Sequence, residues 1–406
     1  MNLKTLRILV IWDITIGLEL NANYKIRQLA ELANRGHTVT WVAARTATPI
    51  RDLGVRTFHL ETLCMRKVVP LVSFLLFQLF SVRHLIPSLN RSDAIILEVR
   101  TVPILFPFLM IRRLGSSSPA LFLRVSTNPV QTGGHLRTLA MHFVDTLSIK
   151  LASKFFDKIL FISPMMAQSY STRCRIPRPK IGVWPSAVDA SFFESRSKAR
   201  VNRLRKEISS PDRLTVLYHG GLSTERGIMD TVRAFKILTD EHFPAKLVLL
   251  GSGPATKEIS EYVTTNNLEG VVQLIGPVSY SEVPDYIAAC DVGIIPWPDH
   301  PWWRYQCPLK LLEYLASSKP VIVSNIPANA CVVGTAPVAV YLRGTSPREI
   351  ANGVRAFSLR RDQLNPRLGR QIAFAFSVEN IADLIESEIT SVIHRSSARV
   401  SGASEH

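Results

Sequence analysis

The sequence predicts an α/β protein built from two parallel sheets that are covered by helices on both faces. Short aliphatic and β-branched runs alternate with longer segments of helical periodicity, which is typical of this class. The 406 residues, 47% of them hydrophobic, are enough for two or three packed domains. Several of the apolar runs end in glycine or proline turns, which gather at one edge of a parallel sheet.

Candidate strands fall into two sets, one in each half of the chain. In the first half they are residues 7–12, 38–43, 94–99, 121–126, 158–163 and 181–185. In the second half they are residues 214–219, 246–251, 271–276, 292–296, 321–324 and 338–342. We therefore expect an N-terminal domain over residues 1–188 and a second domain over residues 214–375, because each set is large enough to form a sheet of its own.

Three segments lie outside these two sets. The polar stretch 189–213 contains no buried run, so it is predicted to be a linker, in which residues 199–208 can form a surface helix. Apolar residues at helical spacing up to Ile393 predict a final amphipathic helix over residues 376–395, with Ser377 at its cap. The Ser-rich residues 396–406 are predicted to be a disordered tail.

Positive charge is concentrated in the first half of the chain. The net charge is +16, and residues 1–185 hold 24 Lys and Arg against 9 Asp and Glu, whereas residues 186–406 hold 24 against 23. This excess predicts contact between the first half and a polyanion: an anionic membrane, a phosphorylated acceptor or a nucleic acid.

Cysteine usage and the N-terminus predict a protein on the cytoplasmic side of the membrane. The five cysteines are scattered without a CxxC pair or metal-ligand spacing, so reduced thiols are expected and no structural zinc is implied. The apolar run 7–12 is too short, and too soon interrupted by Asp13, to be a signal peptide.

The segment 66–86 is unusually apolar for a soluble sheet protein. It falls short of the ~20 residues that span a bilayer. Its polar residues Ser73, Gln78 and Ser81 fall on one side of a helix, and basic residues stand at both ends. Two interpretations remain open: a helix that lies in a membrane interface and a helix buried in the core.

The stretch from Cys307 to Ser324 is the strongest candidate for a ligand site. Pro308 is placed at the first helical position, so the free amides of Leu309, Lys310 and Leu311 would face an anion such as a diphosphate. Glu313 lies about one turn further along the helix, where a carboxylate could accept hydrogen bonds from ribose hydroxyls. The alternative is an ordinary amphipathic helix with a surface Glu.

Glycines and prolines at strand ends provide the other candidate positions. A glycine in a strand-to-helix loop lets a ligand approach the backbone, and Arg226 after such a loop could neutralise a leaving diphosphate without a metal ion. The absence of a G-x-G-x-x-G pattern argues against a standard dinucleotide site. The candidate backbone positions are Gly17, Gly220, Gly221, Gly251, Gly253, Pro277, Val278, Pro308 and Leu309.

Taken in order, these motifs resemble the GT-B glycosyltransferases, specifically the family-4-like retaining enzymes that use nucleotide-sugar donors. The resemblance is strongest from about residue 217 to 324. The residues that carry it are Gly220 with Arg226-Gly227, Leu250-Gly-Ser-Gly253, Gly276-Pro-Val278, Tyr286-Ile-Ala-Ala-Cys-Asp291, Pro308-Leu-Lys-Leu-Leu-Glu313 and Lys319-Pro-Val321, and in the first half Arg35-Gly-His37, Phe161-Ile-Ser163 and Pro185-Ser-Ala-Val-Asp189.

The resemblance implies two Rossmann-like domains that face each other across a cleft, with the last helix crossing back to the first domain. The first domain would bind the acceptor and the second the donor. Glu313 would hold the donor ribose, the amides near Leu309 and Lys310 would meet the diphosphate, and Arg226 would replace the usual lysine. The backbone at Pro277 and Val278 would face the base, and Gly17 would border the phosphates. No metal or other cofactor is expected.

Several positions depart from the family pattern. Tyr305 stands where members commonly carry a Glu for the donor sugar, and Gly221 stands where an Arg is frequent. The histidine expected in the first domain has no match, although His135 and His142 lie near that position. Trp302 and Trp303 could line the sugar pocket by stacking.

The leading hypothesis is a cytoplasmic glycosyltransferase, peripherally associated with the membrane, that moves a sugar to a lipid-linked or glycan-precursor acceptor. Two alternatives remain: a nucleotide-sugar epimerase of the same fold, and a nucleotide-sugar-binding protein with reduced catalysis. A nucleic-acid partner is not expected, because it would explain the charge but not Glu313 or the strand ends that carry glycine.

Overall fold

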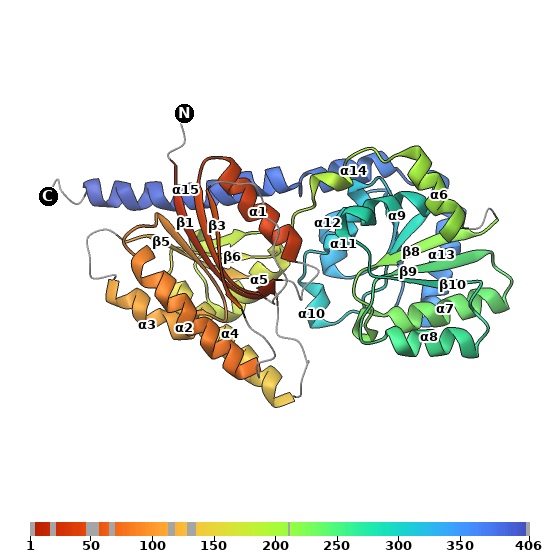
Figure 1. Ribbon diagram of the computed structural model, residues 1–406, viewed down its shortest axis with the longest axis horizontal. Coiled ribbons are helices and arrows are strands. Elements are labelled where there is room, and N and C mark those ends of the chain that lie inside the picture. Colours follow the sequence, from red (N-terminus) through yellow and green to blue (C-terminus); the bar gives the residue numbers. More distant parts are fainter. Residues whose placement is uncertain are drawn as a thin grey trace. The chain divides into compact units, whose positions relative to one another are not determined.

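The computed structural model describes residues 5–16, 22–45, 57–64, 70–112, 118–127, 135–209 and 212–402. The chain divides into two compact units (Figure 1). Unit 1 comprises Met1–Ala187 and Val378–His406, and unit 2 comprises Val188–Ser377. Each unit contains one parallel sheet with helices on both faces, so the predicted α/β class with two doubly wound units is confirmed.

Unit 1 is built on a seven-stranded sheet with the order β3-β2-β1-β4-β5-β6-β7. Its strands are β1 Arg7–Ile16, β2 Thr38–Arg45, β3 Phe58–Cys64, β4 Ala94–Glu98, β5 Ala120–Val125, β6 Lys158–Phe161 and β7 Ile181–Val183. Its helices are α1 Ala22–Asn34, α2 Pro70–Ser88, α3 Val102–Arg112, α4 His135–Phe155, α5 Pro164–Cys174 and α15 Val378–Gly402. Helices α1 and α15 cover one face of the sheet, and α2, α3 and α4 cover the other (Figure 1).

Strand β3 is absent from the predicted strands, and its position explains why. It lies at the edge of the sheet and pairs only with β2 in the described topology. Its sequence alternates, with His59 and Glu61 exposed, instead of forming the continuous apolar run of a central parallel strand.

The apolar segment 66–86 corresponds largely to helix α2, and its polar side points inward. Gln78 and Ser81 are buried, and the Ser81 hydroxyl donates to the carbonyl of Phe77 at 2.8 Å. Phe77 and Leu85 are fully buried on the same helix, so α2 packs onto the unit with both apolar and polar residues. None of the described helices is both long enough and apolar enough to cross a membrane.

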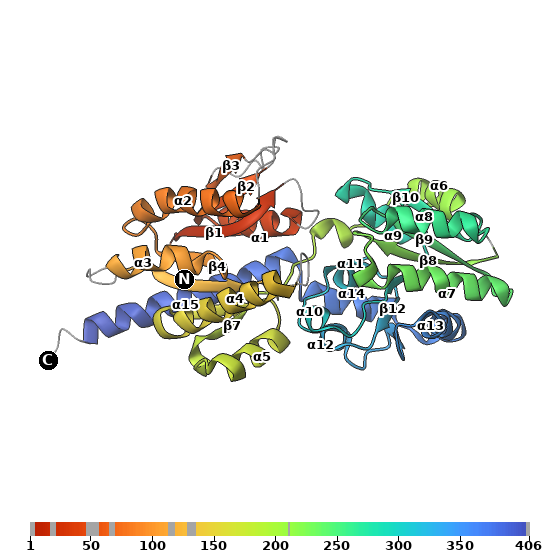
Figure 2. The same ribbon diagram turned by 90° about the horizontal axis from the view of Figure 1, so that it is seen from below.

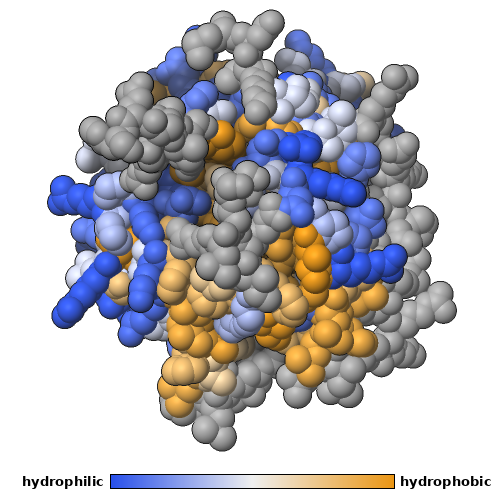
Figure 3. Space-filling view, turned by 90° about the vertical axis from the view of Figure 1, so that its left-hand side faces the viewer, coloured by the Kyte–Doolittle hydropathy of each residue, from blue (hydrophilic) through white to orange (hydrophobic). Residues whose placement is uncertain are grey.

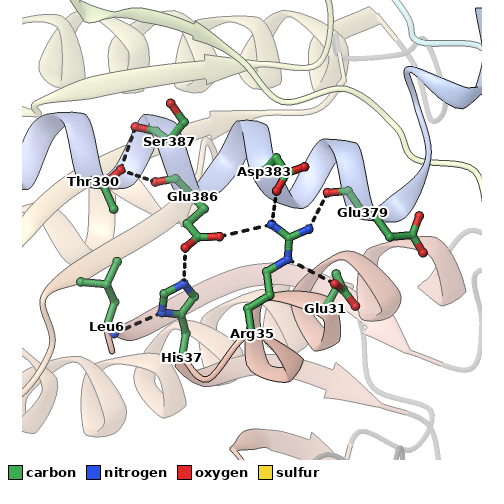
Figure 4. Close-up of polar contacts among 9 residues, drawn as sticks. All are labelled: Leu6, Glu31, Arg35, His37, Glu379, Asp383, Glu386, Ser387 and Thr390. Carbon is green, nitrogen blue, oxygen red and sulfur yellow. Dashed lines mark hydrogen bonds and ion pairs between the residues drawn. The ribbon is translucent and has the colours of Figure 1, made fainter. Parts of the chain in front are cut away.

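Helix α15 returns to unit 1, as expected for the final helix, and an ion-pair network fastens it there (Figure 4). The Arg35 guanidinium contacts Asp383 at 2.5 Å and Glu386 at 3.2 Å, and donates to the carbonyl of Glu379 at 2.8 Å. His37 Nε2 lies 3.2 Å from Glu386. The Arg35-Gly-His37 turn therefore serves to attach the C-terminal helix.

The end of α15 differs from the prediction. The helix continues to Gly402, whereas residues from 396 onward were predicted to be a disordered tail. Serine costs a helix only a few tenths of a kcal/mol per residue, and no proline or glycine interrupts the stretch before Gly402. Residues 403–406 lie outside the described part of the chain.

Unit 2 is built on a six-stranded sheet with the order β10-β9-β8-β11-β12-β13. Its strands are β8 Leu214–His219, β9 Ala245–Leu250, β10 Val272–Gly276, β11 Val292–Ile295, β12 Val321–Ser324 and β13 Ala339–Leu342. Its helices are α6 Lys198–Ile208, α7 Ile228–Asp240, α8 Thr256–Thr265, α9 Val283–Ala289, α10 Pro301–Arg304, α11 Leu309–Ala316, α12 Pro327–Val333, α13 Pro347–Arg360 and α14 Pro366–Phe374. Helices α7 and α8 lie on one face, and α9 and α11 lie on the other (Figures 1 and 2).

Residues 189–213, where the sequence predicts a linker, fall within unit 2 in this division. They contain α6, which packs against α9 and buries Leu204 and Ile208. Arg205 on α6 donates to Asp291 at 2.8 Å, next to the start of β11. The segment is polar on its exposed side, but the buried residues Leu204 and Ile208 fix α6 against α9.

Candidate active site

The strand order of unit 2 places the candidate site at a switch point of its sheet. The chain passes from β8 outward to β10 and then crosses to β11 on the other side of β8. Adjacent strands whose connections leave in opposite directions open a crevice at their carboxyl ends, where α/β sheets bind ligands. His219 ends β8 at this edge, and Pro296 and Trp297 follow β11.

Helix α11 starts at the same edge, because it connects β11 to β12 and must run against the strand direction. Pro308 is its N-cap residue, with φ −76° and ψ 91°, and not its first helical residue as predicted. The Leu311 amide donates to the Pro308 carbonyl at 3.0 Å. The amides at the helix start that remain available to a ligand are therefore those of Leu309 and Lys310. This is one fewer than the three free amides that the sequence predicted.

Glu313 lies inside the fold and is not a surface residue of an amphipathic helix. The residue is 2% exposed. The Tyr280 hydroxyl donates to Glu313 Oε1 at 2.7 Å, and His219 Nε2 lies 3.5 Å from Oε2. A carboxylate that is withdrawn from water and fixed by the Tyr280 hydroxyl is oriented for a specific partner, since burial without a hydrogen bond would be costly.

Lys310 extends from the first turn of α11 toward the loop after β8. Its Nζ lies 5.3 Å from the ring centre of Tyr218. A Cβ at Gly220, whose φ is +106°, would lie 2.7 Å from the same Nζ. Gly220 is therefore required by its backbone conformation and by the approach of the ammonium group.

The electrostatic state of this group of residues follows from burial. Burial raises the pKa of Glu313 to about 7, although the Tyr280 hydrogen bond and the Lys310 charge oppose the rise. Burial lowers the pKa of Lys310 to about 7, and the positive charge of Arg226 lowers it further. The pKa of His219 is lowered by burial and by Lys310, so its ring is neutral at pH 7. The site would gain from an anion that offsets Lys310 and Arg226.

Arg226 is held beside Trp303 by the backbone around it. Its guanidinium lies 5.1 Å from the Trp303 ring centre, and Trp303 Nε1 donates to the carbonyl of Glu225 at 2.9 Å. Gly227, with φ +74°, packs so closely that a Cβ there would lie 2.2 Å from the Pro296 carbonyl oxygen. Arg226 is thereby placed at the end of β11, on the same edge as Gly220 and Lys310.

Three indole rings form a stack beside Arg226. The ring centres of Trp302 and Trp303 are 4.3 Å apart, and those of Trp297 and Trp303 are 4.7 Å apart. Tyr305 directly follows α10, the short helix that carries two of these rings. Trp297 and Trp303 are buried in this stack, and Tyr305 itself stands where the family pattern expects a sugar-binding Glu.

The other glycines serve packing within the unit. A Cβ at Gly251 would lie 2.2 Å from the Gly220 carbonyl oxygen, and one at Gly253 would lie 2.2 Å from the Leu222 carbonyl oxygen. These two residues let the loop after β9 lie directly on the loop after β8. Gly221 differs, because the nearest atom to an added Cβ is Arg226 Nε at 3.9 Å.

Two of the remaining predicted positions follow strand β10, and the third lies outside the described residues. Pro277 is exposed and Val278 is half-buried after β10, beside Tyr280 in sequence. Gly17 lies outside the described residues. The structure thus brings Gly220, Arg226, Lys310 and Glu313 to one edge.

His219 and Tyr280 are site residues to which the sequence assigned no role. Both contact Glu313, from β8 and from the loop after β10. A histidine at the end of an otherwise apolar strand was the available signal for the first. Nothing in the spacing of Ser279-Tyr280 could have indicated the second, since the contact joins residues 33 positions apart.

Unit 1 contains a second group of buried charges that the sequence did not reveal. Arg124 is 1% exposed, and its guanidinium lies 4.1 Å from the Trp12 ring centre and 4.0 Å from that of Trp184. Asp145 lies 3.4 Å from Arg100, and burial raises its pKa to about 7.

Among the described residues, no group of three or more His, Cys, Asp or Glu is arranged to hold a metal ion.

Comparison with known families identifies the second unit. Residues 213–358 match the family described as Glycosyl transferases group 1. The chain is 24% identical over 247 residues to a GDP-mannose-dependent alpha-(1-6)-phosphatidylinositol dimannoside mannosyltransferase of Mycobacterium tuberculosis, which covers 61% of this chain and 60% of the relative. This chain spans between 14% and 60% of the length of the curated relatives that it matches.

Solved structures match both units. A glycosyltransferase from Rickettsia africae superposes with a TM-score of 0.71 at 14% identity, over 96% of this chain and 99% of the other. HepE of Anabaena, solved in complex with UDP and glucose, gives a TM-score of 0.66 at 15% identity, over 98% of this chain and 99% of the other. The chain therefore has the GT-B fold, and its residues 213–358 match the glycosyl transferases group 1 family.

Proposed function

We propose that this protein is a glycosyltransferase that moves a sugar from a nucleotide-sugar donor to a lipid-linked or glycan-precursor acceptor. The observation that carries the proposal is the buried Glu313 beside Lys310 at the start of α11. A carboxylate oriented by the Tyr280 hydroxyl suits a pair of ribose hydroxyls, which donate hydrogen bonds. The group 1 domain match supports this assignment.

The donor diphosphate is assigned to the space between the α11 start, Lys310 and Arg226. Two amides at a helix N-terminus favour an anion, and two cations at one strand edge offset its charge. The same contacts would strengthen as negative charge develops on the leaving diphosphate. Arg226 and Lys310 supply charge stabilisation in this reaction, which we infer to be metal-independent.

The transfer step exchanges one bond at the anomeric carbon. The bond from this carbon to the diphosphate oxygen breaks, and its electron pair leaves with the diphosphate. The acceptor oxygen forms the new bond to the same carbon, and its hydroxyl proton passes to the leaving diphosphate. Retention of configuration is proposed from the resemblance to family-4-like enzymes, with the acceptor on the same face of the sugar as the leaving group.

The acceptor class and location are proposed from relatives and from charge. The mycobacterial relative is named for a phosphatidylinositol acceptor, and the first half of this chain carries most of the positive charge. We therefore assign acceptor binding to unit 1 and place the protein at the cytoplasmic face of a membrane. HepE, the Anabaena neighbour, was solved with UDP, which makes uridine nucleotides the first donors to test.

A thermal-shift panel of nucleotide sugars, followed by transfer assays, tests the proposal. A donor present at 100 times its Kd should stabilise the native state by about 2.7 kcal/mol. Glu313→Ala and Arg226→Ala should each lower the transfer rate about tenfold or more. Glu269→Ala, which changes an exposed carboxylate in a turn, is the matched control and should leave the rate unchanged. Near-normal rates in both site variants, or epimerised donor without transfer, would contradict the assignment.

A further inference from the structure

Large apolar side chains are exposed on one layer of unit 1. Helices α2 and α4 carry most of the exposed large hydrophobic residues found among the described residues. Figure 3 shows apolar side chains gathered on the lower part of this end of the molecule. We call the following residues the apolar face: Leu75, Leu76, Leu79 and Ile86 on α2, and Leu139, Phe143 and Leu147 on α4.

On α4 the apolar face is a single stripe that ends in lysines. Leu139, Phe143 and Leu147 recur every four residues, and Phe143 is 69% exposed. Lys150 and Lys154 continue the same side of the helix and are exposed. A helix that presents Leu and Phe to solvent and then two lysines has the arrangement of a helix in a membrane interface.

On α2 apolar residues lie on both sides of the helix, because Phe77 and Leu85 are buried and Leu75, Leu76, Leu79 and Ile86 are exposed. Gln78 is 1% exposed, whereas its neighbour Leu79 is 69% exposed. Arg83 lies between Leu79 and Ile86 on the exposed side, where a long basic side chain can reach lipid phosphates.

Helix α3 lies between α2 and α4. It contacts α2 on one side and α4 on the other, and the three helices lie side by side (Figure 2). Its sequence is almost entirely apolar, and Pro107 is exposed. The apolar face therefore lies on two helices with α3 between them, and a cluster of this many exposed large apolar side chains is unusual for a surface that meets only water.

The charge of these helices selects the kind of partner. The only carboxylate on α2, α3 and α4 is Asp145, which is 1% exposed and paired with Arg100. Among the residues of these helices whose exposure the structure describes, the basic ones are Arg83, Lys150 and Lys154, and all three are exposed. A second copy of this surface would be repelled by its like charge, whereas an anionic bilayer supplies both hydrocarbon and negative charge.

We propose that α2, α3 and α4 form a docking face that lies in the interface of an anionic membrane, with the apolar face in the lipid and the basic residues at the headgroups. The docking is interfacial, because none of the described helices can span a bilayer. It rests on the membrane location in the proposed function and deepens it by naming the surface that meets lipid, and binding to lipid requires neither donor nor acceptor. It would bring lipid-linked acceptors to unit 1.

Vesicle co-sedimentation with the full chain tests the proposal without any enzyme assay. The probe is a vesicle of phosphatidylglycerol and phosphatidylcholine at about 0.15 M salt, where charges more than ~8 Å apart are screened. The double variant Leu79→Ser with Phe143→Ser should lower binding at least about tenfold, because each side chain contributes its own burial. Lys150→Glu with Lys154→Glu should also lower binding, and the loss should shrink at high salt.

The matched control is Leu359→Ser with Phe374→Ser in unit 2. These residues are 84% and 58% exposed, so the control removes one Leu and one Phe from the surface. Unchanged vesicle binding in the control, with equal melting temperatures for all variants, would assign the loss to the docking face. Equal binding by wild type and the Leu79/Phe143 variant would overturn the proposal, as would a wild-type dimer that this variant converts to a monomer.

The nucleotide thermal shift separates this proposal from the proposed function. The Leu79/Phe143 variant should respond to a donor as the wild type does, since both substitutions lie in unit 1. Loss of vesicle binding with an intact donor response supports docking. Intact vesicle binding by a protein that ignores every donor leaves docking in place and rejects the enzyme assignment.

Discussion

The two units share a doubly wound sheet but differ in the groups that they offer to a partner. Unit 2 holds 22 Lys and Arg against 18 Asp and Glu, and it buries ionisable residues such as Lys310 and Glu313 at one edge of its sheet. Unit 1 holds 26 against 14, and it exposes apolar side chains on α2 and α4. The strand ends of unit 2 therefore offer charged groups to a small ligand, whereas the helix surfaces of unit 1 offer apolar contact to a large partner.

Replacing Lys310 by Met is expected to give the largest effect, because it removes a positive charge placed for the diphosphate. The loss of one charge-stabilising contact should lower kcat/KM by about 10² to 10³. Measurement of transfer from the best donor checks this value. The melting temperature should not fall, because a buried ammonium group is replaced by an apolar chain of similar length.

Lys319→Met is the matched control for this substitution. Lys319 is also a lysine with a pKa lowered by burial in unit 2, but it donates to the carbonyl of Cys290 and lies at the other end of α11. Its loss should destabilise the unit and leave the catalytic constants of the folded protein unchanged. Equal kinetic losses in the two variants would show that the α11 start has no special role, and the contrast between the units would fail.

The pH dependence of donor affinity is the next largest expected effect. In the free protein Lys310 loses its proton above about pH 7, and a bound diphosphate favours the protonated form. Binding above pH 7 therefore takes up a proton, and affinity should fall by up to about tenfold per pH unit between pH 7 and 9.

Isothermal titration at several pH values measures this dependence. Lys310→Arg should flatten the profile, because arginine keeps its charge over the whole range. A steep profile that persists in Lys310→Arg would assign the titration to another group, and a flat profile in the wild type would place the diphosphate elsewhere.

Gly220→Ala should have a moderate effect that geometry alone explains. The backbone there has φ +106°, and the new methyl group would lie 2.7 Å from Lys310 Nζ, so the ammonium group must move. The backbone strain should cost about 2 kcal/mol of stability, and the displacement of the ammonium group should weaken donor binding. Gly270→Ala is the control, because nothing lies within 4 Å of a Cβ at that position. Equal affinities of the two variants would mean that Lys310 is not in contact with the ligand.

Much of the fold could be predicted because parallel strands are buried on both faces. Central strands such as β8 and β12 are continuous apolar runs, and their predicted bounds coincide with the structure. The edge strand β3 alternates, so the same criterion could not find it. Residues 189–213 looked like a linker because a helix with one narrow buried side, such as α6, is polar in composition.

The site was predictable only where its signals are local. The proline, lysine and glutamate of α11 are close in sequence, and helix geometry relates them. The contacts of His219 and Tyr280 with Glu313 depend on strand order, which local patterns do not determine. The inward side of α2 was unpredictable for the same reason, since periodicity shows that two sides differ but not which side meets the sheet.

Arg35→Ala should have the smallest effect, and it tests how unit 1 retains its last helix. Arg35 contacts Asp383, Glu386 and the carbonyl of Glu379 on α15, and its side chain is 21% exposed. Partial exposure weakens such pairs, so the substitution should cost about 1 kcal/mol of stability, measured by denaturant unfolding. Arg361→Ala, at an exposed arginine of unit 2, is the control. Donor-induced stabilisation should persist, because the substitution removes a contact within unit 1 alone. A loss of donor response in Arg35→Ala would show instead that α15 couples the units, and that the chemistry of unit 2 depends on the surface of unit 1.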